Sequence, residues 1–127
     1  MKKLNGFTLI ELMITLLIAA ILAGVSLPAY RASVIKGNRR AAQAVMMDIA
    51  NREQQYFIAN RAFADATTLG YTLPTELTGK YTWAVDLTVP AGPPPGFTIT
   101  FTAAGSQVSD GALTLDSQGN KGPTGKW

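Results

Sequence analysis

The sequence contains no cysteine and no histidine among its 127 residues. Without cysteine there is no disulfide bond and no thiol nucleophile, and without either residue type the commonest ligands of zinc are missing. No phosphate-binding loop, catalytic triad or paired-carboxylate arrangement is recognisable. The sequence therefore predicts a protein that is not an enzyme, has no catalytic residues and holds no metal or cofactor.

Basic residues outnumber acidic ones by 11 to 8, and the mean hydropathy is +0.15. The apolar excess is concentrated at the start of the chain. Two of the basic residues, Lys2 and Lys3, lie within the first six positions, and without them nine basic residues remain against eight acidic ones. Bulk charge therefore gives little support for nucleic-acid binding. The length allows one small domain besides an apolar segment.

Residues 1–29 are the most informative segment, because a short basic start precedes a long apolar run. Phe7 opens this run, and no charged residue occurs from Leu12 to Pro28. Glu11 is the single acid within it. An ionised carboxylate near the end of a bilayer helix costs about 2–3 kcal/mol unless it finds a partner, so Glu11 requires an explanation.

Three interpretations of this segment compete. An ordinary secretory signal is cleaved after small residues beyond the apolar region, and the stretch from Ser26 to Ala29 is a poor site of that kind. A plain membrane anchor explains the length, because a helix from Phe7 to Pro28 spans about 33 Å, enough for a bilayer core. An anchor explains Glu11 only if its side chain snorkels to the lipid headgroups.

The third interpretation is a resemblance to the class III signal peptide of type IV pilins. The resemblance lies in Gly6, Phe7 and the following Thr-Leu-Ile-Glu-Leu of residues 8–12. It implies that prepilin peptidase cleaves between Gly6 and Phe7 and that the new amino group of Phe7 is methylated. It also implies that this amine is neutralised by Glu11 of a neighbouring subunit inside an apolar filament core, which sets the register of assembly.

Two further stretches resemble PilE-like type IVa pilins. One comprises residues 39–44 and 50–57, and the other comprises residues 113–119 together with Trp127. The resemblance implies a homo-oligomeric helical filament that functions in adhesion, twitching motility or DNA uptake. It also implies a bacterial inner-membrane precursor that is moved into an extracellular pilus, or fimbrium, by prepilin peptidase and the assembly machinery. A minor pilin or competence pseudopilin that binds DNA, and a type II secretion pseudopilin, are the alternatives.

The apolar run continues into a helical pattern without a convincing stop before about residue 59. Apolar residues recur at spacings of four and seven, which predicts one buried face formed by Val34, Ala41, Val45, Ile49 and Tyr56. Asp48 and Arg52 form a favourable i,i+4 pair. We therefore expect one helix from Phe7 to about Ala59, roughly 80 Å long. Its first half is apolar all round and its second half is amphipathic.

Gly24 and Pro28 are the positions at which this helix is expected to bend or loosen. The resemblance implies that the segment near Pro28 can unwind in filaments. The expected organisation is a leader peptide at residues 1–6, a transmembrane and filament-core half-helix at residues 7–29, and a periplasmic or extracellular globular domain at residues 30–127.

The rest of the chain predicts a small antiparallel sheet. Gly70, Pro74 and Gly79 indicate a connecting segment up to residue 79. Alternating apolar and polar residues predict strands at residues 81–89 and 97–102, separated by a stiff loop with three prolines at 93–95. Leu113 and Leu115 indicate a third strand. The prediction is an α+β fold with three to four strands packed on the amphipathic half of the helix.

Lys36, Arg39 and Arg40 form a small basic cluster just after the apolar run. Such a cluster could contact DNA, acids on neighbouring subunits or anionic lipid headgroups, and it could equally be a solvated helix face. No aromatic residues alternate with it as they do on base-stacking surfaces.

Many pilins carry two cysteines that close the C-terminal loop, and the resemblance places Asp110 and Lys126 at these positions. We predict a salt bridge between them that partly replaces the disulfide bond, with packing by Trp127. Two solvated charges, contributing about 0–1 kcal/mol, are the alternative. Asp110 and Asp116 alone fall short of a calcium site, because a hard cation requires several oxygen ligands.

Overall fold

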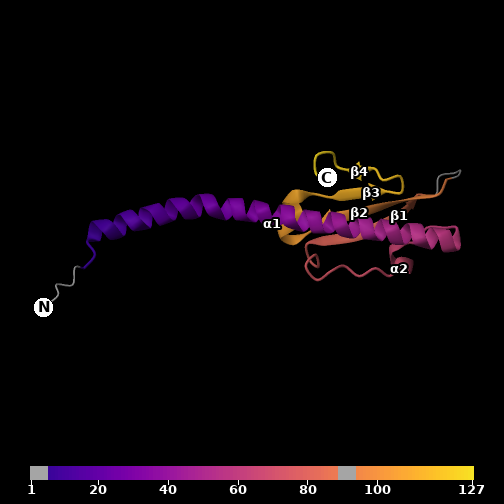
Figure 1. The fold of residues 1–127 in the computed structure, drawn as a ribbon, viewed down its shortest axis with the longest axis horizontal. Helices are drawn as coiled ribbons and strands as arrows, with labels where there is room; N and C mark the ends of the chain where they lie inside the picture. Colours follow the sequence, from indigo (N-terminus) through magenta and orange to yellow (C-terminus); the bar gives the residue numbers. More distant parts are fainter. Residues whose placement is uncertain (1–5, 89–93) are drawn as a thin grey trace. The chain divides into compact units, whose positions relative to one another are not determined.

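The computed structural model describes residues 6–88 and 94–127, which belong to two units, Met1–Val34 and Ile35–Trp127. Helix α1 (Leu9–Asn60) runs through both units, and the strands within the described residues belong to the second (Figure 1). The predicted α+β fold and the extent of the helix are thus confirmed. The end of the first predicted strand at Val89 and part of the proline loop lie outside the described residues.

The first unit consists of the first half of α1. Its large apolar side chains, from Phe7 to Tyr30, are each between 50% and 80% exposed. The helix is long and apolar enough to cross a membrane by length and composition. Gly24 and Pro28 both lie inside it without interrupting it. Such a surface is stable only when lipid or other protein covers it.

The second unit contains a four-stranded antiparallel sheet in the order β1 (Tyr81–Thr88), β2 (Gly96–Ala103), β3 (Leu113–Asp116) and β4 (Lys121–Gly122). Val85 is opposite Ile99, and Ile99 is opposite Leu115, so apolar residues align across three strands on one face. Threonines occupy most of the intervening positions, such as Thr82 opposite Thr102. This alternation is the reason that one face packs against α1 while the other remains polar.

The core lies between the sheet and the second half of α1. The helix contributes Ala42, Val45, Met46, Ile49 and Glu53, each at most 9% exposed. The predicted buried face was therefore correct for Val45 and Ile49 and wrong for Val34, which is 40% exposed. A strict spacing of seven drifts around a straight helix by about 20° per repeat, whereas positions 42, 45, 46, 49 and 53 stay on one side.

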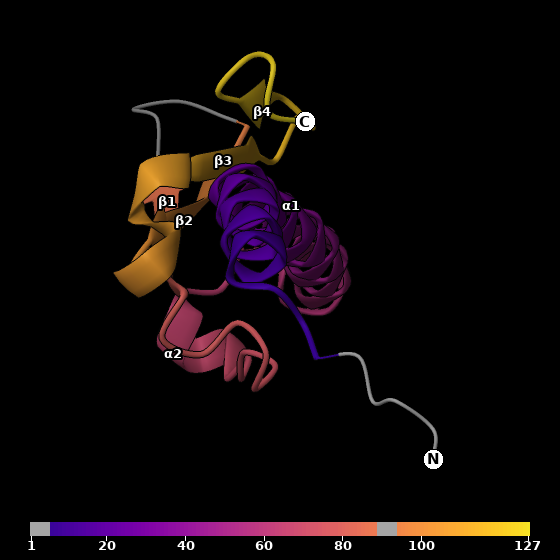
Figure 2. The same ribbon diagram turned by 90° about the vertical axis from the view of Figure 1, so that its left-hand side faces the viewer.

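Helix α1 ends at Asn60 because Arg61 adopts a left-handed conformation with φ 59°, and its N–H donates to the carbonyl of Phe57. No glycine marks this end in the sequence. Two short elements were also not predicted, the one-turn helix α2 (Ala66–Leu69) and the 3-10 helix η1 (Gly105–Asp110). Figures 1 and 2 show α2 and β4 on opposite sides of the second half of α1.

Candidate functional site

The carboxylate of Glu11 caps the start of α1. Its Oε2 accepts hydrogen bonds from the backbone N–H of Thr8 (2.8 Å) and from the Thr8 hydroxyl (2.7 Å). The N–H of Glu11 in turn approaches the Thr8 hydroxyl oxygen at 3.3 Å. This is a capping box, and its local sequence signal is the Thr-x-x-Glu pattern of residues 8–11. No ion pair of Glu11 occurs within residues 6–88 and 94–127.

The predicted cleavage site lies just before the helix. Gly6 and Phe7 precede Leu9 in non-helical backbone, and the side chain of Phe7 is 80% exposed. No side chain or backbone atom lies near the position that a Cβ of Gly6 would occupy. An exposed peptide outside regular structure is the kind of bond that proteases reach.

A second arrangement concerns the basic cluster. Lys36, Arg39 and Arg40 border a pocket of about 300 Å³ on the second unit. Gln43 of α1 and three residues of the C-terminal turn complete it: Gly125, Lys126 and Trp127. The structure therefore adds a fourth cation, Lys126, and an aromatic ring to the three residues that are clustered in the sequence.

Asp110 lies beside this pocket and joins two of its cations. Its Oδ1 is 3.5 Å from the Arg39 guanidinium and 3.8 Å from Lys126 Nζ, and its side chain is only 5% exposed. The structure thus brings Asp110 and Lys126 together and adds Arg39, which the sequence did not indicate. The carboxylate also accepts a hydrogen bond at 3.1 Å from the hydroxyl of Tyr81. Burial, together with the charge of Asp110, raises the pKa of Tyr81 to about 12.

The C-terminal turn is held by further contacts that need no disulfide bond. Gln43 Nε2 donates to the carbonyl of Lys126 at 2.6 Å, and the Trp127 indole N–H donates to the carbonyl of Gly122 at 2.9 Å. Lys121 Nζ lies 5.0 Å from the centre of the Trp127 ring, within the range of a cation–π interaction.

A fully buried glutamine, Gln107, connects η1 with the helix. Its Nε2 donates to the carbonyl of Ile35 (2.8 Å) and to the hydroxyl of Tyr81 (3.0 Å). Its Oε1 accepts from Asn38 Nδ2 at 3.1 Å, and Asn38 Oδ1 accepts from Lys80 Nζ at 3.0 Å. Each polar atom of this glutamine is therefore satisfied, which a buried amide requires. Nothing in the local sequence marks Gln107 for this position.

Comparison with known families is decisive for the identity of the chain. Residues 1–27 match the family described as "Prokaryotic N-terminal methylation motif". Residues 28–115, more than half of the chain, match the family described as "Type IV minor pilin ComP, DNA uptake sequence receptor". The chain belongs to the type IV pilins. Because pilins are structural proteins, the family also confirms that the chain is not an enzyme.

This pilin is similar to a curated relative, the "Fimbrial protein" of Neisseria meningitidis serogroup A / serotype 4A (strain DSM 15465 / Z2491). The two are 30% identical over 109 residues, which are 84% of this chain and 59% of the relative. The pilin therefore spans about three fifths of the length of this relative.

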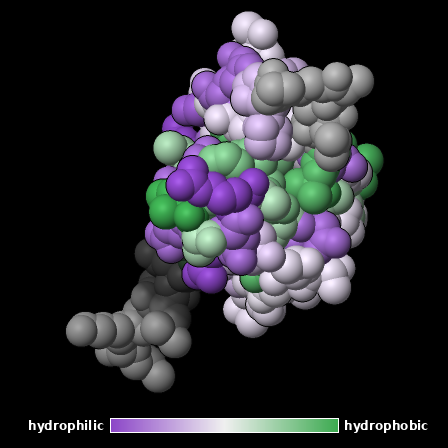
Figure 3. Space-filling model, turned by 90° about the vertical axis from the view of Figure 1, so that its right-hand side faces the viewer, coloured by the Kyte–Doolittle hydropathy of each residue, from purple (hydrophilic) through white to green (hydrophobic). Residues whose placement is uncertain are grey.

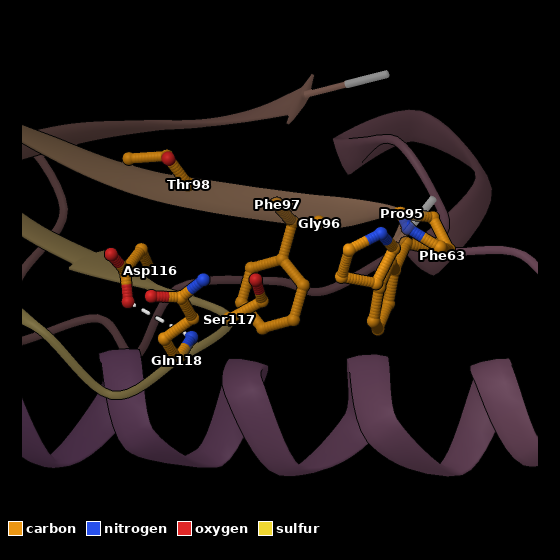
Figure 4. Close-up of a pocket in the computed structure, with 9 residues that line it drawn as sticks. Phe63, Pro95, Gly96, Phe97, Thr98, Asp116, Ser117 and Gln118 are labelled. Carbon is orange, nitrogen blue, oxygen red and sulfur yellow. Dashed lines mark hydrogen bonds between the residues drawn. The ribbon is translucent and has the colours of Figure 1, made fainter. Parts of the chain in front are cut away.

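Another pocket, of about 510 Å³, lies at the start of β2, where Phe63 packs edge-on against Phe97 near Ser117 and Gln118 (Figure 4). Asp116, the one charged residue of this pocket, accepts hydrogen bonds from the N–H groups of Gln118 and Asn120. These bonds hold its carboxylate in the turn between β3 and β4. Burial opposes the ionisation of Asp116, but hydrogen bonds from the side-chain amide of Asn120 and from these N–H groups lower its pKa overall. The end of the molecule shown in Figure 3 carries separate apolar patches among polar ones.

No group of three or more potential metal-binding side chains occurs in the described part of this pilin. Asp110 and Asp116 do not share a site, because one is paired with Arg39 and Lys126 and the other closes the turn before β4.

Proposed function

We propose that this pilin is a subunit of a type IV pilus that is cleaved between Gly6 and Phe7. In this proposal residues 1–6 are the leader, residues 7–29 cross the inner membrane before assembly, and residues 30–127 form the domain outside it. The single observation that supports the proposal is the first unit, whose apolar side chains from Phe7 to Tyr30 are at least 50% exposed.

Assembly then exchanges one apolar environment for another. Because lipid tails are as apolar as leucine side chains, moving the half-helix from lipid to neighbouring helices gains little from the hydrophobic effect. Packing and polar pairs decide the outcome instead. A carboxylate at Glu11 and a methylated amine at Phe7 are the only charges such a core would contain, and each is costly unless it meets the other. Loosening of the helix at Gly24 and Pro28 would let the subunit adjust to its neighbours.

Mass spectrometry of filaments sheared from cells tests this proposal. We expect subunits that begin at methylated Phe7. Filaments whose subunits retain residues 1–6 would contradict the proposal. The abundance of the chain relative to other pilins in the same sample distinguishes a major from a minor subunit.

We also propose that the chain is a minor pilin that binds DNA through its globular domain. Two observations support this second proposal. The family matched by residues 28–115 is described as a DNA uptake sequence receptor. The described part of the domain also gathers Lys36, Arg39, Arg40 and Lys126 around one pocket. Lys and Arg side chains that neutralise phosphates supply most of the affinity for DNA, which makes binding sensitive to salt.

Fluorescence anisotropy of a labelled duplex with the full-length protein in a nonionic detergent tests DNA binding. We expect binding at low salt, with the logarithm of the association constant falling linearly with the logarithm of salt concentration. Absence of binding at low salt would remove the DNA proposal and leave the pilus proposal intact.

A further inference from the structure

The pocket bordered by Lys36, Arg39, Arg40 and Lys126 also has an acidic residue beside it. Four cationic side chains border it, yet a carboxylate, that of Asp110, lies within 4 Å of two of them. An acid beside a site for phosphates weakens phosphate binding by Coulomb repulsion. Asp110 therefore needs a reason to be there, and its surroundings provide one.

Asp110 is the residue that holds both sides of the pocket. Arg39 comes from α1 and Lys126 from the C-terminal turn, and both cations approach the same carboxylate oxygen, Oδ1. The other oxygen, Oδ2, accepts from the Tyr81 hydroxyl, which fixes the orientation of the carboxylate. The side chain of Asp110 is only 5% exposed, and the two cations within 4 Å of it offset its negative charge.

The glycine at position 111 leaves room for the contact between Lys126 and Asp110. A Cβ at Gly111 would lie 3.3 Å from Lys126 Nζ, and Gly111 has a φ of +77°, which disfavours any side chain there. The ammonium group thus reaches Asp110 along a path that a larger residue at position 111 would crowd. Long, flexible lysine and arginine side chains otherwise lose much rotamer freedom when a ligand orders them.

We propose that the pocket between Lys36, Arg39, Arg40 and Lys126 binds a backbone phosphate of DNA, and that Asp110 is a positioning residue which holds Arg39 and Lys126 ready for it. The inference rests on the DNA-binding function proposed above. The volume of about 300 Å³ is at the lower limit for an organic ligand and suits a phosphate with its neighbouring sugar. Trp127 lines the pocket, where a sugar or base can contact its ring.

Positioning and repulsion predict opposite effects of removing the acid. If Asp110 acts only through its charge, Asp110→Asn removes a repulsion and DNA binds about two- to threefold more tightly. If Asp110 positions the cations, the same change releases Arg39 and Lys126 and DNA binds more weakly. At about 0.1 M salt, one phosphate contact contributes roughly eightfold to the association constant. We therefore expect Asp110→Asn to weaken binding about five- to tenfold.

The test measures anisotropy of a fluorescein-labelled duplex of about a dozen base pairs over a series of salt concentrations, with the full-length protein in nonionic detergent. Asp110→Asn is compared with Asp86→Asn, which removes one exposed carboxylate on β1 away from the pocket. Lys126→Gln and Arg39→Gln are compared with Arg61→Gln, an exposed cation after the end of α1. Circular dichroism verifies that each variant is folded.

We expect weaker binding and a salt slope lower by about one for Asp110→Asn, Lys126→Gln and Arg39→Gln. Asp86→Asn should bind at least as tightly as the wild type, and Arg61→Gln should weaken binding less than the pocket variants do. The double variant Asp110→Asn with Lys126→Gln should bind about as weakly as Asp110→Asn alone, since the two residues act as one unit.

Several outcomes overturn the inference. If the wild type binds DNA and Asp110→Asn binds equally or more tightly, Asp110 does not position the cations, while DNA binding itself stands. If Asp110→Asn does not fold, Lys126→Gln and Arg39→Gln decide, and binding like that of Arg61→Gln rejects the pocket. If the wild type does not bind DNA, the proposed DNA function fails first.

Tryptophan fluorescence tests, without DNA, whether Asp110 holds the C-terminal turn in place. In a Trp83→Phe background, Trp127 is the single tryptophan, and its quenching by neutral acrylamide reports the exposure of the C-terminal turn. Asp110→Asn should increase this quenching, and Asp86→Asn should leave it unchanged. Equal quenching in both variants would show that Asp110 does not hold the turn.

Discussion

The two halves of α1 have the same secondary structure and opposite environments. Ile18 in the first half is 51% exposed, whereas Ile49 in the second half is fully buried. The difference comes from the sheet, which covers the second half with residues such as Phe101 and Leu113. Both halves therefore form a helix, but only one of them is buried. The sheet of the same chain covers the second half, and the first half must be covered by lipid or by other subunits.

The largest expected effect concerns the one acid of the first half. We expect Glu11→Gln to abolish pilus assembly, or reduce it severely, while the protein still inserts into the membrane. Glutamine can maintain the capping box with Thr8, so the start of the helix is kept. It cannot neutralise the amine of Phe7, which would then be buried without a partner. Electron microscopy and immunoblots of sheared filaments measure assembly, and membrane fractions measure insertion.

Thr8→Val is the matched control for this prediction. It removes the hydroxyl of the capping box, at a cost of about 0.5–2 kcal/mol to the helix, and leaves the carboxylate of Glu11 in place. Filaments should still form. Two results would contradict this prediction: normal filaments from Glu11→Gln, or loss of filaments only in Thr8→Val. Either would show that Glu11 acts as a helix cap and that its charge is not needed for assembly.

A pair of identical substitutions tests the comparison between the halves directly. We expect Ile49→Ala to lower the free energy of unfolding of the second unit by about 2–5 kcal/mol, because it leaves a cavity in a packed core. Ile18→Ala should change it by less than about 0.5 kcal/mol. Urea denaturation in detergent, followed by tryptophan fluorescence, measures both. Similar losses in the two variants would mean that the halves do not differ in the way the structure indicates.

Local patterns were sufficient to predict the long helix and the main strands of this fold, but not the short helices α2 and η1. The helix was expected from Phe7 to about Ala59 and runs from Leu9 to Asn60. The prediction succeeded because a long helix tolerates the glycine and proline residues of this stretch. The first two strands follow from the alternation of large apolar residues with small or polar ones. Their pairing as neighbours follows from the short connection between them.

Long-range polar contacts could not be predicted in the same way. Gln107 bonds to Ile35 and Asn38, about 70 residues earlier, and no local pattern encodes such a partner. Arg39 was expected within a basic cluster, and only the folded chain places it against Asp110. The resemblance to pilins with a C-terminal disulfide suggested that Asp110 and Lys126 would be neighbours, because aligned positions occupy similar places. The sequence did not predict the burial of Glu53, because glutamate side chains are rarely buried.

Glu53 provides a smaller effect and a contrast with Glu11 on the same helix. It is fully buried, its Oε2 accepts from the N–H of Ala64 at 2.9 Å, and its Oε1 has no hydrogen-bond partner among the residues that the structure describes. Burial raises the pKa of Glu53 above the ordinary 4.5. The folded state therefore retains this proton longer than the unfolded state does. Its contribution to stability is complete below pH 4.5 and is lost as the pH rises through the raised pKa.

We expect Glu53→Gln to remove this dependence on pH. Protonated glutamate and glutamine both place a donor at the unpartnered position, so the variant and the wild type should be about equally stable below pH 4.5. Toward neutral pH the variant should become the more stable of the two. Thermal melting from acid to neutral pH measures the difference, and Glu76→Gln, an exposed glutamate of the same unit, controls for net charge. A difference that does not change with pH would refute the assignment.

The smallest expected effect belongs to the surface of the second half. Asp48 and Arg52 form an i,i+4 pair at 3.3 Å, with side chains that are 48% and 53% exposed. Such pairs contribute about 0.3–0.5 kcal/mol and are screened by salt. Asp48→Asn should therefore lower stability by no more than this amount, and the loss should disappear at about 1 M salt. Arg52→Gln should cost more, because it also removes the guanidinium that lies 4.7 Å from the Tyr71 ring. A loss from Asp48→Asn that approaches that of Ile49→Ala would show that charge, and not packing against the sheet, distinguishes this half of the helix from the first.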